Sequence, residues 1–171
     1  PDGSLVYVAN DSVHDVEGNI EDVGLSPGTV SVIDALSNTV VATIGVGVRP
    51  FGVAVAPDGK HVYVTNMQDG TASVIDTVTN TLTATVTATA TVGPEPEGIA
   101  VSPSGTSVYV TNSATGTVSV IDTATNAVTA QVAVGGVPVS VAFDTSGQHA
   151  YIVDQGSETV SVIDTLSNTA I

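Results

Sequence analysis

VYVTN at residues 62–66 is followed by SVIDTVTN at 73–80, and this pair of segments recurs along the whole chain. The other copies are VYVAN (6–10) with SVIDALSN (31–38), VYVTN (108–112) with SVIDTATN (119–126), and AYIVD (150–154) with SVIDTLSN (161–168). The aspartates of successive SVID segments are 42, 46 and 42 residues apart. The chain of 171 residues is therefore built from four copies of a unit of about 42 residues.

Each unit divides into four short strands. In the third unit these are GIAVS (98–102), SVYVTN (107–112), TVSVID (117–122) and AVTAQVAVG (127–135). Their side chains alternate with period two, and β-branched valine and threonine dominate, as in strands. PSG (103–105) forms one turn, and the turn after SVID ends at Asn126, which tolerates a left-handed backbone.

Four strands in a unit of this length are typical of a β-propeller blade. We therefore expect an all-β chain, a β-propeller of four-stranded antiparallel blades with about four blades present in an incomplete ring. The expected blades of this single partial propeller are 1–47, 48–93, 94–135 and 136–171. The first lacks its inner strand and the last has a truncated outer strand, so missing blades or a partner chain would be needed to close the ring.

The composition excludes several kinds of partner. Seventeen acidic residues face two bases, Arg49 and Lys60, which gives a formal net charge of -15. A nucleic-acid surface needs clustered lysine and arginine, so no nucleic-acid partner is expected. The sequence has no run of 18 apolar residues, so insertion into a membrane is not expected. The charge favours cations or a basic partner.

The VYVTN segments, the SVID-x-x-x-N turns and PDG (57–59) resemble the YVTN-repeat β-propeller family over essentially the whole chain. The resemblance implies a ring of about seven blades in surface-layer-like or secreted proteins, related to lactonase-type propellers. It therefore implies an extracellular or cell-surface location, with the periplasm as an alternative. It also implies that ligands bind on the face at the channel mouth.

The loops expected on that face carry the candidate site residues. They are the 14-residue insertion within 11–28 and the connections VGVRPFG (46–52), VGPEPEG (92–98) and VGGVPVS (134–140). A protein or a small ligand is the expected partner at this face. The candidate ligand-binding residues are Arg49, Phe51, Glu95, Glu97 and Val137.

The insertion offers oxygen ligands for a hard cation, so Ca²⁺ is the candidate cofactor, although no cofactor is certain. Its spacing does not match the calcium loop of EF-hands, and a solvated or partner-contacting loop is the favoured interpretation. The candidate metal ligands are Asp11, Asp15, Glu17, Glu21 and Asp22, with Asn19 beside them.

No catalytic residues are predicted. Glu95 and Glu97 could act as an acid–base pair, but exposed charges in a proline-rich turn are the simpler interpretation. His61 and His149 are expected on the opposite face, and no serine has a positioned histidine partner. The favoured function is a non-enzymatic scaffold for binding or protein interaction. The alternative is a fragment of a metal-dependent lactonase or hydrolase of the propeller type, so enzymatic activity stays open.

Overall fold

The structure is a computed structural model that describes residues 2–11, 26–86 and 92–171. These residues form strands and turns without a helix, and the strands make four antiparallel sheets in chain order. The first sheet contains β1 (Leu5–Asn10), β2 (Pro27–Asp34) and β3 (Thr39–Val48). The second contains β4 (Pro50–Val55), β5 (His61–Asn66), β6 (Thr71–Asp76) and β7 (Thr81–Val86). The third contains β8 (Pro96–Val101), β9 (Ser107–Asn112), β10 (Thr117–Asp122) and β11 (Ala127–Ala133). The fourth contains β12 (Pro138–Phe143), β13 (His149–Asp154), β14 (Thr159–Asp164) and β15 (Thr169–Ala170).

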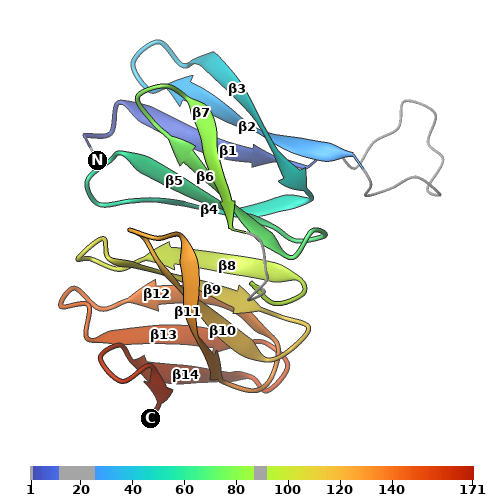
Figure 1. Ribbon diagram of the computed structural model, residues 1–171, viewed down its shortest axis with the longest axis vertical. Coiled ribbons are helices and arrows are strands. Elements are labelled where there is room, and N and C mark those ends of the chain that lie inside the picture. The colour runs from blue at the N-terminus through green and yellow to red at the C-terminus, as the bar shows by residue number, and fades with distance from the viewer. Residues whose placement is uncertain (1, 12–25, 87–91) are drawn as a thin grey trace.

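This architecture confirms the predicted all-β partial propeller. Within each sheet every strand pairs with the next strand of the chain, as in a blade. The first strands of neighbouring sheets contact each other, β4 with β8 and β8 with β12. Figure 1 shows the sheets following one another from the N-terminal to the C-terminal end of the molecule, with the ring open.

The repeated aspartates fix the turns between the third and fourth strands. Asp122 Oδ1 accepts hydrogen bonds from the N–H groups of Ala124 and Thr125, at 3.1 and 2.8 Å, and from the Thr125 hydroxyl at 2.8 Å. These bonds hold the pKa of Asp122 below its usual value, because they favour the ionised form. Asn126 ends the turn with φ 54°, the left-handed conformation expected for it.

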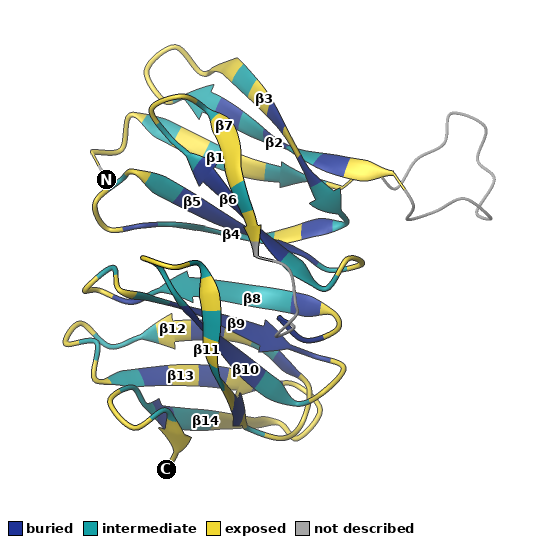
Figure 2. Cartoon of the chain, viewed as in Figure 1, coloured by how far each residue is buried: buried dark blue, intermediate teal, exposed yellow. Residues whose placement is uncertain are grey.

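The core lies between neighbouring sheets. The repeated tyrosine of one sheet packs on the next sheet, so Tyr63 and Tyr109 are each only 1% exposed. Aliphatic side chains from both sheets fill the rest of each interface, and Figure 2 shows the buried stretches on β5, β6 and β9. The same position in the fourth sheet has no sheet packed on it, and Tyr151 is 43% exposed.

Two glycines allow the first strands to approach closely. A Cβ on Gly52 would lie 2.4 Å from the carbonyl oxygen of Glu97, and a Cβ on Gly98 would lie 2.7 Å from Cα of Ser140. Thr65 reinforces this contact, because its hydroxyl accepts the Gly52 N–H at 2.8 Å and donates to the Glu97 carbonyl at 2.9 Å. Ser140 occupies the equivalent position in β12, where it is exposed.

Alternating strand directions give the molecule two faces. The loop face carries the loops between second and third strands and the connections between sheets, including 46–50, 92–96 and 134–138. The turn face carries the turns between first and second strands and between third and fourth strands, including 56–60 and 77–80.

Candidate functional site

Three connections on the loop face place the predicted residues Arg49, Glu95 and Val137 at equivalent positions, each before a buried proline. The carbonyl of each accepts a backbone hydrogen bond from the residue that follows the second strand of its sheet. The donors are Met67, Ser113 and Gln155, at 2.8, 3.1 and 2.8 Å respectively. We call this backbone hydrogen bond the anchor of the connection. The same anchor holds a cation in Arg49, an anion in Glu95 and an apolar side chain in Val137, ahead of successive sheets.

Backbone conformation sets these positions apart. Arg49 and Glu95 have φ of 54° and 56°, a left-handed conformation that is uncommon for residues other than glycine. At both positions the carbonyl that accepts the backbone hydrogen bond belongs to the residue in this conformation. At the third connection Gly135 and Gly136 take the positive φ values instead, at 82° and 58°.

A buried amide supports the first connection. Asn66 Oδ1 accepts the Gly47 N–H at 3.1 Å, and Asn66 Nδ2 donates to Thr71 Oγ1 and Ser73 Oγ, both at 2.9 Å. Asn112 repeats the last two bonds with Thr117 and Ser119, at 3.0 Å each. The first connection is therefore bonded to the end of β5, whereas the equivalent oxygen, Asn112 Oδ1, has no partner among the described residues.

Glu95 lines a cleft of about 340 Å³ on the loop face. Its other lining residues are Met67, Gln68, Asp69, Gly70 and Pro94. Asp69 is fixed in place because its Oδ2 accepts the Val48 N–H at 2.7 Å. The cleft thus combines two carboxylates with the thioether of the single methionine of the chain.

The other predicted ligand-binding residues lie apart from this cleft lining. Phe51 is 59% exposed, and Val137 is exposed as well. Glu97 is half-buried at the start of β8, with its carbonyl bonded to Thr65. The structure therefore brings Glu95 together with Asp69 and Met67, which the sequence analysis did not select.

Of the predicted metal ligands, Asp11 lies within the described residues. Its Oδ2 is 3.8 Å from Nε of Arg49, and both side chains are partly exposed, so this ion pair contributes less than about 1 kcal/mol. The remaining predicted ligands, Asp15, Glu17, Glu21 and Asp22, lie outside the described residues, as does Asn19. The part of the chain that the structure describes holds no group of three histidine or acidic side chains arranged for a metal. The calcium site stays a prediction.

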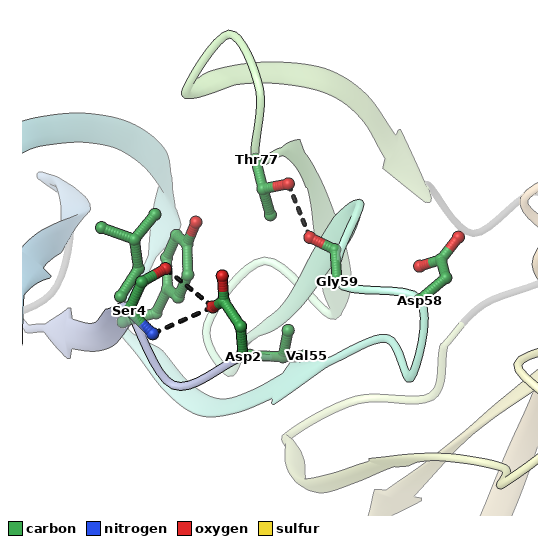
Figure 3. Close-up of a pocket in the computed structure, with 8 residues that line it drawn as sticks. Asp2, Ser4, Val55, Asp58, Gly59 and Thr77 are labelled. Atoms are coloured by element: carbon green, nitrogen blue, oxygen red, sulfur yellow. Dashed lines mark hydrogen bonds between the residues drawn. The ribbon is translucent and has the colours of Figure 1, made fainter.

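The turn face contains clefts between neighbouring sheets. Figure 3 shows the one between the first and second sheets, where Asp2 and Asp58 lie on different sides of the opening. Ser4 donates to Asp2 Oδ1 from its N–H and its hydroxyl, and Thr77 donates to the Gly59 carbonyl at 2.7 Å. These bonds order the rim of the cleft.

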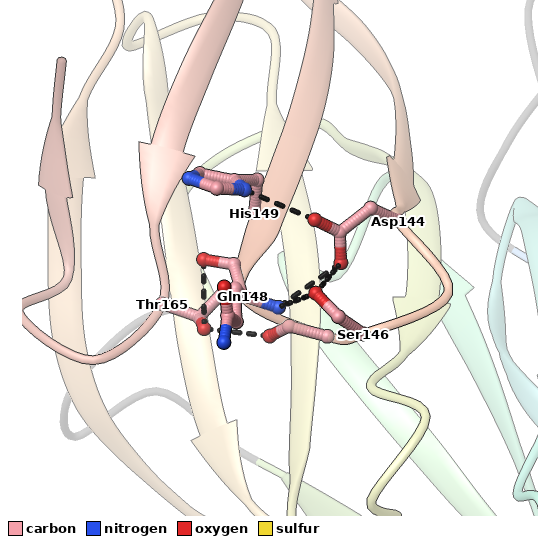
Figure 4. A network of polar contacts seen from close by, with 6 residues as sticks. Asp144, Ser146, Gln148, His149 and Thr165 are labelled. Carbon is pink, nitrogen blue, oxygen red and sulfur yellow. Dashed lines mark hydrogen bonds and ion pairs between the residues drawn. The ribbon is translucent and has the colours of Figure 1, made fainter.

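His61 and His149 lie on this turn face, as predicted. His149 Nδ1 is 3.0 Å from Asp144 Oδ2, and Asp144 Oδ1 accepts bonds from Ser146 and Gln148 (Figure 4). Partial desolvation opposes ionisation of Asp144, but the hydrogen bonds from His149, Ser146 and the backbone outweigh it and lower its pKa to about 2. The pair therefore stabilises the turn before β13.

The family described as lactonase, seven-bladed β-propeller, matches residues 1–130 and, in a second alignment, residues 54–170. The chain belongs to this family. The two matches overlap over residues 54–130. No curated protein matches the sequence.

Two examples from the solved structures that this chain resembles show the shared fold. Hydrazine synthase of Kuenenia stuttgartiensis has a TM-score of 0.77 and 27% identity, over 84% of this chain and 42% of the synthase chain. A functionally unknown protein from Desulfotomaculum acetoxidans has a TM-score of 0.78 and 18% identity, over 100% of this chain and 52% of that protein. The chain thus spans about half the length of these structures or less. Within the described residues, no helix reaches the length and apolar character that a membrane span requires.

Proposed function

We propose that this chain is part of a non-enzymatic propeller scaffold, of the YVTN-repeat type, that binds a protein or a small ligand on its loop face. The observation that supports this most is the common anchor of Arg49, Glu95 and Val137. A constant backbone with side chains of different character is suited to recognition, because each position can contribute a different contact. The cleft beside Glu95 gives such a ligand a concave seat.

Fragment screening by ¹H–¹⁵N NMR tests the proposal. We expect small amines, acids, sugars or peptides to shift the amides of Phe51, Gly70 and Glu95, and Glu95→Ala to weaken their binding. Glu158→Ala removes an exposed charge from the loop face of the fourth sheet and serves as the matched control. If no fragment binds at the loop face, the proposal fails.

The second candidate is a metal-dependent lactonase or hydrolase, and membership of the lactonase family favours it. Glu95 and Asp69 would then supply two carboxylates at one cleft. Incubation with γ- and δ-lactones, with and without Ca²⁺, Mn²⁺ or Zn²⁺, tests this. Turnover above the buffer rate that disappears in Glu95→Gln would favour the hydrolase over the scaffold.

We also propose an extracellular or cell-surface location. The strong excess of acidic residues and the resemblance to secreted YVTN-repeat proteins support it. Immunodetection in the medium and cell envelope, compared with the cell lysate, tests this, and protein confined to the lysate would contradict it.

A further inference from the structure

A cleft of common design opens on the turn face at each junction between two sheets. Its floor is the repeated tyrosine of one sheet, and its rim is a turn glycine and a threonine of the next sheet. The volumes at the three junctions are about 370, 470 and 90 Å³ in chain order. The corresponding residues are Tyr7, Gly59 and Thr77, then Tyr63, Gly105 and Thr123, then Tyr109, Gly147 and Thr165.

One side chain explains why the third cleft is small. Phe143 stands at the end of β12, where the second and third sheets have Val55 and Val101. Its ring meets that of Tyr109 edge to face, with centroids 4.9 Å apart and an interplanar angle of 82°. The Tyr109 hydroxyl donates to Asn168 Oδ1. The Phe143 ring therefore fills the space at this junction, and both of these polar groups have a hydrogen-bond partner.

At the first and second junctions no aromatic ring occupies the position of Phe143, and some buried polar atoms lack hydrogen-bond partners among the described residues. The Tyr63 side chain as a whole is 1% exposed and lines the second cleft, but its hydroxyl oxygen is not among the buried atoms that lack a partner. The buried Tyr7 hydroxyl at the first junction does lack a partner among the described residues. The amide oxygens equivalent to Asn168 Oδ1, those of Asn80 and Asn126, lack partners as well. Buried polar groups without partners are uncommon, and a bound ligand or water is the usual reason.

The charge at these clefts is negative. Asp58 lines both of them, and Asp2 adds a second carboxylate to the first (Figure 3). Asp58 Oδ1 accepts the Lys60 N–H at 2.9 Å, whereas Oδ2 accepts no hydrogen bond from the described residues. Burial raises the pKa of Tyr63, and the nearby charges of Asp58 and Asp122 raise it further.

No ion pair among the described residues involves these carboxylates, although His61 lines the second cleft. Within residues 2–11, 26–86 and 92–171, Asp58 has no ion pair, and Arg49 pairs with Asp11 on the other face. Apolar groups stand beside the carboxylate, Val55 at the first cleft and Ala56 with Pro57 at the second. One or two carboxylates with a phenol fall short of the six to eight oxygens that Ca²⁺ takes. An aliphatic chain that ends in an ammonium group matches this lining, because its methylene groups can pack on the apolar side chains and its ammonium can donate to the carboxylate.

We propose that the two open clefts each bind the alkylammonium group of a lysine side chain from a basic partner. At the second cleft the ammonium donates to Asp58 Oδ2 and to the Tyr63 oxygen, and the Tyr63 hydroxyl in turn donates to Asn126. At the first cleft the ammonium donates to Asp2 Oδ2 beside Asp58, and the buried Tyr7 hydroxyl donates to Asn80. The methylene stem covers the apolar wall. Two such clefts on successive sheets fit a partner segment with two lysines, and the net charge of -15 attracts it. This site lies on the face opposite to the proposed loop-face site.

The test is a titration of ¹⁵N-labelled protein with Nα-acetyl-lysine methylamide, followed by NMR at pH 8 and 0.15 M salt. We expect saturable shifts with a Kd on the order of 1–10 mM, because the contacts are few and partly exposed. The amides of Gly59 and Gly105 should shift, and that of Gly147 at the closed junction should not. The Nε-acetylated analogue, which has no charge, should produce no saturable shift.

Matched variants separate the two sites. Val55→Phe and Val101→Phe copy the natural Phe143, so each should abolish the shifts at one junction and keep those at the other. Asp58→Asn should weaken both sites about three- to five-fold. Glu158→Gln removes one negative charge on the loop face of the fourth sheet, away from both clefts, and should change the affinity of neither.

Several results would overturn the proposal. Equal shifts with the acetylated analogue would show that charge is not recognised. Shifts that persist in Val55→Phe and Val101→Phe would place the binding elsewhere. If a phenylalanine variant fails to fold, the comparison of Asp58→Asn with Glu158→Gln decides, since equal affinities in these two would refute the role of Asp58.

Discussion

Replacing Asp154 by asparagine should make the protein more stable. Asp154 ends β13, where β5 and β9 end in Asn66 and Asn112, and it is 1% exposed. Its Oδ2 accepts a hydrogen bond from Ser161 at 2.6 Å, but its buried Oδ1 has no partner among the described residues. Asn66 and Asn112 instead donate two bonds each to hydroxyl groups at 2.9–3.0 Å.

The magnitude follows from these contacts. The amide of Asp154→Asn can donate to Ser161 and Thr159, and a hydrogen bond of this kind contributes about 1 kcal/mol. The substitution also removes a buried carboxylate without a cation, which is unfavourable by a similar amount or more. Because one existing bond is exchanged, we expect a net gain of about 2 kcal/mol, or about 4–8 °C in Tm for a chain of this size.

Urea and thermal unfolding at pH 7 measure the effect. The reverse change in the third sheet, Asn112→Asp, is the matched control and should lower stability by a similar amount. An unchanged or lower midpoint in Asp154→Asn would refute the reasoning, and so would an Asn112→Asp variant as stable as the parent.

Three further predictions concern the tyrosines, the glycines and the turns. Tyr109→Phe should cost about 1 kcal/mol, since it leaves Asn168 Oδ1 without its donor, whereas Tyr7→Phe should be nearly neutral; equal losses in urea unfolding would contradict this. Gly98→Ala should cost more than about 2 kcal/mol because its Cβ would meet backbone at 2.7 Å, and Gly45→Ala, with open space around its Cβ, should be tolerated; Tm values compare the two. Stability should fall as the pH drops below about 4, because carboxylates whose folded pKa is depressed stabilise the fold only above their unfolded pKa. A urea midpoint that stays constant from pH 5 to pH 2 would exclude that contribution. The turn carboxylates concerned are Asp34, Asp76, Asp122 and Asp164.

The repeat was sufficient to predict the fold because its signals are local. The turn from Asp122 to Asn126 depends on a side chain that bonds to its own backbone neighbours, and such a turn can be recognised from spacing alone. The period-two pattern then placed the strands, and the recurrence at 42 residues placed the sheets.

The candidate site was only partly predictable. Glu95 was found from its proline-rich connection, but Asp69 and Met67 join it through a loop of the preceding sheet, a contact that no local pattern encodes. The closed third cleft likewise depends on Phe143 and Tyr109 meeting across two sheets. Two differences between the aligned repeats were visible in the sequence. Residue 143 is phenylalanine where the other copies have valine, and residue 154 is aspartate where the other copies have asparagine. The common features of the copies therefore predicted the scaffold, whereas the contacts made at the positions that differ came only from the structure.

The two glycines of the inner strands have a consequence for the modularity of the chain. Gly52 and Gly98 let the following sheet approach to a distance that a single methyl group would forbid. Ser140 carries that extra carbon, so the fourth sheet cannot accept a copy of the third sheet at the same spacing. The units are alike in sequence, but they differ at this position of the inner strand. A chain with the fourth unit moved ahead of the second would have to widen its channel or leave that junction unpacked.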